Sequence, residues 1–200
     1  MFYRERDIVG NMNPQALAEL NRRATKCLFQ QGITVESWYQ IYRHIEVTDW
    51  LIPWFFALGA HTNGGKVGEI GMRGGSSTVA FLMGVSKVNG HLWSMDIEPC
   101  GDAIRNIEAF GFSPWHTFMQ GNSLEMDFPE PLDVLFIDGD HHYEGVKGDY
   151  DRHYPKVKSG GIILFHDTLS CPDDVGRLCE ERGIMTIPYG KSGLGVQVKG

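Results

Sequence analysis

The chain lacks the features that are typical of disulfide-linked, membrane and nucleic-acid-binding proteins. Its four cysteines (Cys27, Cys100, Cys171 and Cys179) form no C-x-x-C pair and no regular spacing, which indicates a reducing, cytoplasmic setting instead of a disulfide framework. No run of 18 apolar residues occurs and no basic-then-apolar leader opens the sequence, so we expect no contact with a membrane. The formal net charge of −7 argues against nucleic acid as a partner.

What remains is typical of a globular protein. Hydrophobic residues make up 42% and charged residues 22% of the 200 residues, which suits one domain, 1–200, with a sizeable core. We expect an N-terminal helical extension over 1–62 and a ligand-binding core over 63–200. The aromatic-rich segment 50–58 has three alternative roles: packing on the main sheet, a lid over a small-molecule site, or a contact between subunits of a homo-oligomer.

From Lys66 onward, strand and helix patterns alternate, which predicts an α/β fold with a parallel sheet and helices on both faces. The linker 188–193 is too short for a parallel crossover, so the last two strands should form an antiparallel hairpin. Strands are expected at 67–71, 91–95, 115–119, 133–137, 162–165, 184–187 and 195–198. Helices are expected at 75–85, 103–110, 143–157 and 172–182.

The segment 66–82 is the most informative. It reads as a strand, a glycine-rich turn and the start of a helix, an arrangement in which free backbone N–H groups can hold an anionic ligand. It does not match the dinucleotide fingerprint, because Arg73 stands where the second glycine should be. Glu69 at the strand end can accept hydrogen bonds from a cationic amino group, which S-adenosylmethionine has and NAD lacks.

This acid-x-Gly-x-x-x-Gly-x-Ser pattern resembles the first motif of class I S-adenosylmethionine-dependent methyltransferases. The resemblance implies a Rossmann-like methyltransferase fold with a seven-stranded, mostly parallel sheet in the order 3-2-1-4-5-7-6. It also implies that S-adenosylmethionine lies along this segment. Cofactor contacts are then expected from Glu69, Gly71, Arg73, Gly75, Ser76 and Ser77.

Polar residues follow every strand of the expected sheet, at the edge where open α/β sheets bind ligands. Asp96 lies about 20 residues after Gly75, the spacing at which an acid binds ribose hydroxyls. The methyltransferase resemblance adds Ile97 against the adenine face, and Asn122 or Ser123 at the adenine edge.

Two segments, 136–144 and 154–168, resemble the small O-methyltransferase group that includes catechol, caffeoyl-coenzyme A and macrocin-type enzymes and cephalosporin hydroxylase-like proteins. In that group, an acid after the fourth strand and two residues after the fifth bind a divalent cation. Asp138, His166 and Asp167 stand at these positions, and Asp138 also borders the expected cofactor site. Lysine is the base in these relatives, and His141 falls near its position.

His166 departs from the group, which usually has Asp or Glu there, and magnesium prefers oxygen ligands. Three alternatives follow. The site could take manganese, iron or zinc; it could take magnesium on Asp138 and Asp167 alone; or it could hold no metal, with His166 as the base.

The sequence therefore predicts a methyltransferase that O-methylates a small hydroxylated acceptor, with S-adenosylmethionine and Mg²⁺ or Mn²⁺ as cofactors. Catalytic roles are expected for His141 and His166. A non-catalytic domain that binds the same cofactor and a nicotinamide oxidoreductase are the alternatives.

Overall fold

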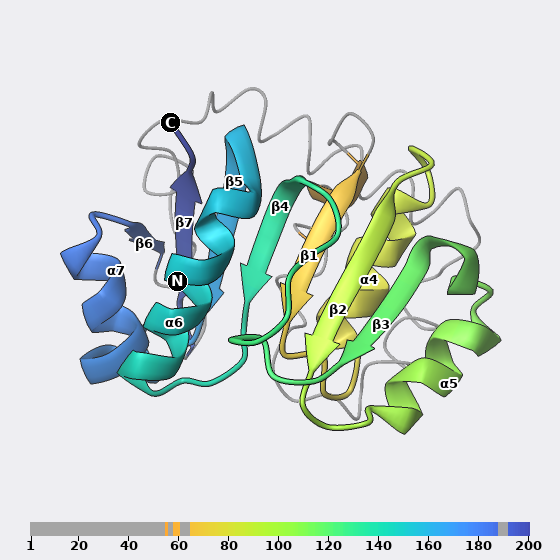
Figure 1. The fold of residues 1–200 in the computed structure, drawn as a ribbon, viewed down its shortest axis with the longest axis horizontal. Helices are drawn as coiled ribbons and strands as arrows, with labels where there is room; N and C mark the ends of the chain where they lie inside the picture. Colours follow the sequence, from red (N-terminus) through yellow and green to blue (C-terminus); the bar gives the residue numbers. More distant parts are fainter. Residues whose placement is uncertain (1–54, 56–57, 61–64, 188–191) are drawn as a thin grey trace, which may run out of the picture.

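A computed structural model describes residues 55, 58–60, 65–187 and 192–200 of the chain, and its centre is a seven-stranded sheet (Figure 1). The strand order is β3-β2-β1-β4-β5-β7-β6, as the methyltransferase resemblance implied. All neighbours pair in parallel except β7, which is antiparallel to β5 and to β6, so the expected C-terminal hairpin is confirmed. The strands are β1 (Lys66–Ile70), β2 (His91–Asp96), β3 (His116–Gln120), β4 (Leu132–Ile137), β5 (Val157–His166), β6 (Met185–Ile187) and β7 (Leu194–Val198).

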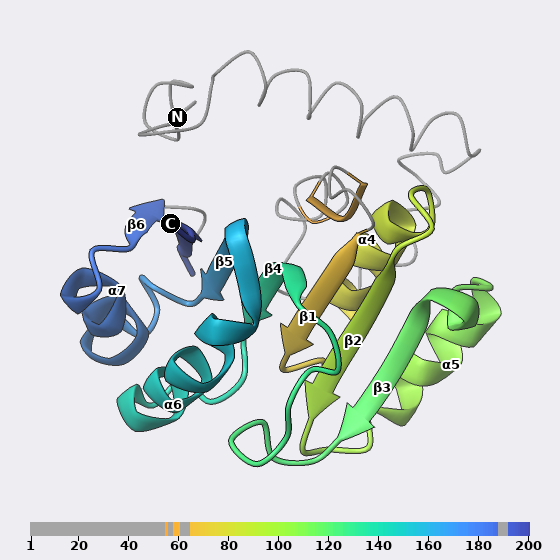
Figure 2. The ribbon, with the colours of Figure 1, turned by 45° about the horizontal axis from the view of Figure 1, so that its top comes forward.

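Helices cover both faces of this sheet (Figures 1 and 2). Helices α4 (Ser76–Val85) and α5 (Gly101–Ala109) contribute to one apolar cluster, and α6 (Tyr143–His153) and α7 (Arg177–Glu181) to the other. Strand β4 supplies both clusters in alternation, Val134 and Phe136 to the first and Leu135 and Ile137 to the second. A strand buried on both faces needs apolar side chains at every position, which explains its almost uninterrupted apolar sequence.

The structure corrects the expected boundaries between α6 and β5. The helix predicted over 143–157 ends at His153, and a short 3-10 turn, Tyr154–Lys156, follows, because Pro155 has no N–H to continue the helical bonding. The turn predicted at 159–161 lies inside β5. There Gly160 has a φ of 77°, and the pairing with β4 changes register.

The C-terminal helix also begins differently from the prediction. The helix expected over 172–182 starts as a π-type turn, η4 (Pro172–Gly176), before α7. The expected extension 1–62 lies outside the described residues, apart from Phe55 and residues 58–60. Phe55 is fully buried, with its ring centroid 4.7 Å from that of Phe81 and 4.8 Å from that of Phe136, so this described piece packs on the face that carries α4.

Of the segment 50–58, the structure describes Phe55 and Leu58, and both are buried in the apolar cluster to which α4 contributes. The other residues of that segment lie outside the described ranges, and a lid or a subunit contact stays a prediction. Among the helices of the described residues, none is long and apolar enough to span a bilayer.

Candidate active site

A cavity of about 550 Å³ opens at the carboxyl ends of β1 to β4. Seven of the predicted site residues line it: Gly71, Arg73, Asp96, Ile97, Asn122, Ser123 and Asp138. The other predicted cofactor contacts, Glu69, Gly75, Ser76 and Ser77, are not among its lining residues, and neither are the predicted ligands and bases His141, His166 and Asp167. The structure thus brings most of the strand-end residues to one hollow, and it places the start of α4 behind that hollow.

Gly71 makes the close approach between β1 and β4 possible. Its φ is 91°, and a Cβ atom at this position would lie 2.0 Å from the carbonyl oxygen of Asp138. Its N–H donates to the carbonyl of Met95 at 2.9 Å. Any larger residue at 71 would therefore collide with the backbone of the β4 end, so this glycine shapes the site before any ligand enters.

Glu69 lies beneath the turn in the interior. It is fully buried, and its carboxylate accepts hydrogen bonds from three hydroxyls: Ser77 at 2.5 Å, Thr78 at 2.8 Å and Ser94 at 2.6 Å. Burial raises its pKa to about 7, against the opposing effect of the hydroxyl donors. The predicted contact of Glu69 with a cofactor amino group stays a prediction; what the structure shows is a carboxylate that ties β1, β2 and the first turn of α4 together.

The α4 start is closely packed. Gly75 has a φ of 80°, and a Cβ there would approach the Cβ of Ala103 to 2.8 Å. Ser76 and Ser77 are 9% and 5% exposed. The helix start can therefore receive an anion only through its backbone and through small movements of these hydroxyls.

Asp96 joins the end of β2 to the glycine turn. Its carboxylate accepts from the backbone N–H of Arg73 at 2.8 Å and from that of Glu98 at 2.9 Å. Ile97 beside it is 70% exposed, an unusual state for an isoleucine that lines a cavity. Both positions suit the predicted roles, a carboxylate for hydroxyls and an apolar face for a ring.

Asp149 on α6 is a cavity residue that the sequence reasoning missed. It is 2% exposed, lines the cavity, and accepts the hydroxyl hydrogen of Ser123 at 2.6 Å. Burial raises its pKa to about 6. Asp149 lies in the middle of a helix and not at the end of a strand, so the strand-end pattern could not identify it. Only its place on the buried side of the helix could have indicated it.

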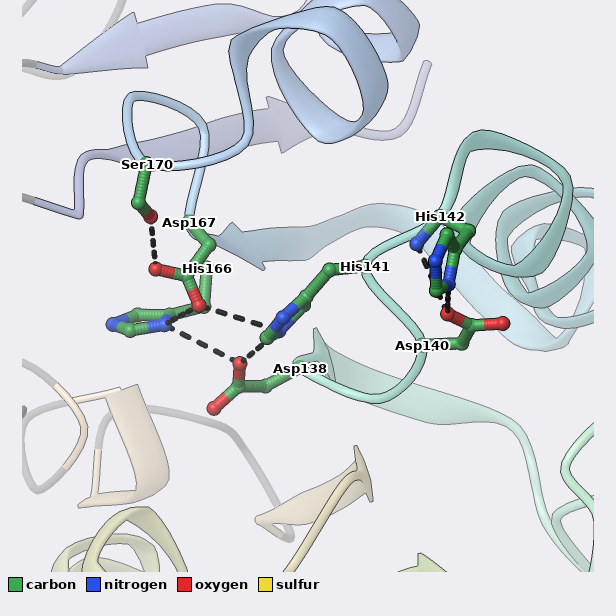
Figure 3. Close-up of polar contacts among 7 residues, drawn as sticks. All are labelled: Asp138, Asp140, His141, His142, His166, Asp167 and Ser170. Atoms are coloured by element: carbon green, nitrogen blue, oxygen red, sulfur yellow. Dashed lines mark hydrogen bonds and ion pairs between the residues drawn. The ribbon is translucent and has the colours of Figure 1, made fainter.

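On the other side of Asp138, two carboxylates and two imidazoles converge (Figure 3). Nε2 of His141 lies 3.2 Å from Asp138 Oδ1 and 3.2 Å from Asp167 Oδ2. Nδ1 of His166 lies 3.3 Å from Asp138 Oδ1 and 2.8 Å from Asp167 Oδ2. Ser170 donates its hydroxyl to the second oxygen of Asp167. The cluster thus holds every side chain proposed as a ligand or base.

Each imidazole in the cluster is biased toward its charged form. Burial opposes a charge on His166, but the hydrogen bonds to Asp138 and Asp167 outweigh it and raise its pKa to about 10. The hydrogen bond to Asp138 raises the pKa of His141. Asp167 has a lowered pKa, because the hydrogen bonds from His166 and Ser170 outweigh the effect of its burial. Nε2 of His166 is buried without a hydrogen-bond partner among the described residues.

Asp138, His141 and Asp167 also meet the distance requirement of a cation site, because one ligand atom from each lies within 4.8 Å of the others. The predicted ligand set used His166 in place of His141. His142, by contrast, has a side chain that is 89% exposed and pairs with Asp140 at 2.7 Å, away from the cluster (Figure 3). The sequence could not show which histidine is the better cation ligand, because the contact of His141 with Asp167 depends on the conformation of the loop before α6.

The strand order, the glycine turn and the polar edge together define the class of a Rossmann-like methyltransferase. A family described as "Methyltransferase domain" matches residues 69–168, half of the chain. The chain belongs to this family, which confirms the predicted class and decides against a nicotinamide oxidoreductase.

Solved structures with the same fold include the S-adenosylhomocysteine-bound methyltransferase PaMTH1 of Podospora anserina. It is 14% identical, the match covers 94% of this chain and 97% of that one, and the TM-score is 0.68. The O-methyltransferase TomG of Streptomyces achromogenes, in complex with S-adenosylmethionine, is 17% identical over 91% of this chain and 90% of its own, with a TM-score of 0.63.

Among curated proteins, "Uncharacterized protein R132" of Acanthamoeba polyphaga mimivirus is 49% identical over 39 residues, 20% of this chain. This match covers only 18% of that protein's length.

Proposed function

We propose that this chain transfers the methyl group of S-adenosylmethionine to a hydroxyl of a small acceptor, with a divalent cation held at the strand ends. The cofactor would occupy the cavity, with its ribose at Asp96 and its ring beside Ile97. The acceptor would lie at the cluster of Asp138, His141, His166 and Asp167. Structural neighbours bound to S-adenosylmethionine and S-adenosylhomocysteine support this cofactor.

One observation carries the proposal: Asp138 belongs to both sites. It lines the cavity and it is also a member of the carboxylate and imidazole cluster. A cofactor in the cavity and an acceptor at the cluster would therefore meet at one side chain. Methyl transfer requires this arrangement, because the acceptor oxygen must attack the methyl carbon in line with the bond to sulfur.

The donor set fits a divalent cation of borderline character. Two carboxylates and one imidazole supply oxygen and nitrogen atoms within 4.8 Å of one another, which favours Mn²⁺ over Mg²⁺. The best donors are Asp138, His141 and Asp167. When bound there, a cation would lower the pKa of a hydroxyl that contacts it.

The geometry favours His141 as a ligand over its predicted role as the base. Its Nε2 points at two carboxylates, 3.2 Å from each, and a base needs a ring nitrogen that faces the acceptor proton. His166 is 2% exposed, and its Nδ1 faces the same two carboxylates, so its part would be to hold Asp138 and Asp167 in position.

In the reaction, the acceptor oxygen forms a bond to the methyl carbon as the carbon–sulfur bond breaks, and the sulfonium leaves as a neutral thioether. The hydroxyl proton passes to solvent beside His141, the most exposed member of the cluster, with 35% of its side chain accessible. The described residues contribute alignment and partial exclusion of water, since the cofactor already carries the reactive group.

Three variants test the shared position of Asp138. Asp96→Ala should weaken S-adenosylhomocysteine binding by tenfold or more and leave Mn²⁺ binding unchanged. Asp167→Ala should do the reverse, and Asp138→Ala should weaken both. The measurements are calorimetric titrations with S-adenosylhomocysteine and with Mn²⁺ on protein dialysed against EDTA.

Asp102→Ala is the control, because its side chain is 88% exposed on α5 and should change neither titration. Activity is measured as S-adenosylhomocysteine released from S-adenosylmethionine in the presence of a panel of catechols and other hydroxylated compounds. It should fall on chelation and return with Mn²⁺. Normal binding of both ligands by Asp138→Ala would refute the shared site.

A further inference from the structure

Asp149 is a buried carboxylate without an ion-pair partner among the described residues. It is 2% exposed, and within the part of the chain that the structure describes, its only side-chain hydrogen bond is the one that Ser123 donates to Oδ1 at 2.6 Å. A buried charge is costly unless cations or several donors compensate it. One hydrogen bond from a serine hydroxyl compensates only a small part of the free energy needed to bury a carboxylate, so we expect a further hydrogen-bond donor at Asp149.

The second oxygen of Asp149, Oδ2, faces no donor in the described ranges of the chain. No described residue donates a hydrogen bond to Oδ2, which lies 3.3 Å from the position that a Cβ on Gly139 would take. Gly139, Ser123 and Asp149 all line the cavity. A ligand that fills this end of the cavity would bring its own donor to Oδ2.

The surroundings specify a flat ring that carries such a donor. Ile97 and Leu124 line the same cavity and are 70% and 41% exposed, so two apolar side chains are free to cover a ring. The absence of a Cβ at Gly139 lets that ring approach Asp149. A carboxylate acceptor selects an N–H donor over a carbonyl.

We propose that Asp149 is the specificity residue for the purine base of the cofactor, accepting a hydrogen from the exocyclic 6-amino group. Ser123 donates its hydroxyl to Oδ1 and so holds the carboxylate in orientation. This inference rests on the proposed use of S-adenosylmethionine and adds the residue that distinguishes adenine from a 6-oxo purine.

The test compares S-adenosylhomocysteine with S-inosylhomocysteine, in which a carbonyl oxygen replaces the amino group. Calorimetry on the wild-type chain should show at least about a tenfold preference for the amino compound. Asp149→Asn can turn an amide N–H₂ toward the carbonyl, so the preference should fall to about one or reverse. The matched control is Asp151→Asn on the same helix, where the carboxylate pairs with Lys147 and Arg182 at the surface.

The outcomes separate the inference from the proposed function. Equal wild-type affinity for the two compounds would overturn the role of Asp149 while leaving the cofactor in place. The same would follow if Asp149→Asn lowered both affinities by the same factor, because that result describes a structural role. Binding of neither compound by the wild-type chain would overturn the proposed cofactor and the inference together. Equal affinity in the wild-type comparison overturns the inference even if the variant does not fold.

Discussion

The buried carboxylate of Glu69 should impose a pH dependence on folding that one substitution removes. Glu69 is fully exposed to solvent only in the unfolded chain, and in the folded chain burial raises its pKa from its usual value of 4.5 to about 7. Because the folded-state pKa is raised, the contribution to stability is fully present below pH 4.5 and is lost as the pH rises through 7.

The size of this effect follows from the two pKa values. They differ by about 2.5, and each pKa unit corresponds to about 1.4 kcal/mol, so Glu69 should cost the fold ~3 kcal/mol between pH 4.5 and pH 8. Glu69→Gln keeps the shape of the side chain and removes the ionisation. It also replaces one acceptor oxygen with a donor, which leaves at least one of the three hydroxyls without its acceptor at every pH.

The assay is urea unfolding of both proteins, followed by circular dichroism at pH 5, 6, 7 and 8. The free energy of unfolding of the wild type minus that of Glu69→Gln should fall by ~2.5 kcal/mol from pH 5 to pH 8, because part of the change lies below pH 5. Other titrating groups are common to both proteins and cancel in the difference. Asp102→Asn, with its exposed side chain, should follow the wild type within about 0.5 kcal/mol. Parallel profiles for wild type and Glu69→Gln would refute the reasoning.

Three further predictions concern residues that stabilise the fold around the site. Gly71→Ala should abolish folding or lower the melting temperature sharply, because its Cβ meets the Asp138 carbonyl, whereas Gly74→Ala should melt like the wild type, because nothing lies within 4 Å of its added Cβ. Phe55→Ala should cost about 3–5 kcal/mol of unfolding free energy in a urea titration, since the ring is fully buried between two others. Asp174→Ala should cost about 1 kcal/mol, because it removes the acceptor of the Tyr143 N–H at the start of α6; Asp174→Asn should retain most of that stability in the same titration.

The topology was predictable because the sequence features that indicate it lie within single strands and turns, or in the order of the motifs along the chain. Buried strands followed by polar turns recur along the chain, and the short linker before β7 leaves only an antiparallel pairing. The boundaries of β5 were not predictable in the same way. Ser159, Gly160 and Gly161 form a typical turn sequence, but β5 pairs with β4 on either side of them, at Val157 and at Ile162, so they lie inside the strand as an irregularity.

The position of a site residue was predictable where it follows from the end of a single strand. It was not predictable where it depends on contacts with residues of another helix, strand or loop. Asp96 and Asp138 line the cavity because the last residue of a parallel strand and the residue just after it lie at that edge of the sheet. The burial of Glu69 depends on hydroxyls from α4 and β2, which no local pattern connects to β1. The preference for His141 as a ligand depends likewise on a loop conformation that brings it to Asp167.

The order of the strands explains why Asp138, among the acids that the structure describes, lies both in the cavity lining and in the carboxylate and imidazole cluster. Strand β4 pairs with β1 on one side and with β5 on the other, so its carboxyl end adjoins both the glycine turn and the His166–Asp167 pair. Neighbouring strands lie about 5 Å apart, so Asp167, which directly follows β5, is two strands, about 10 Å, from the glycine turn that follows β1. A donor bound at that turn and an acceptor bound beside β5 can therefore come into contact only over the end of β4. The crossover that places β4 between β1 and β5 is thus what brings the cavity and the cluster together at one side chain, as the proposed methyl transfer requires.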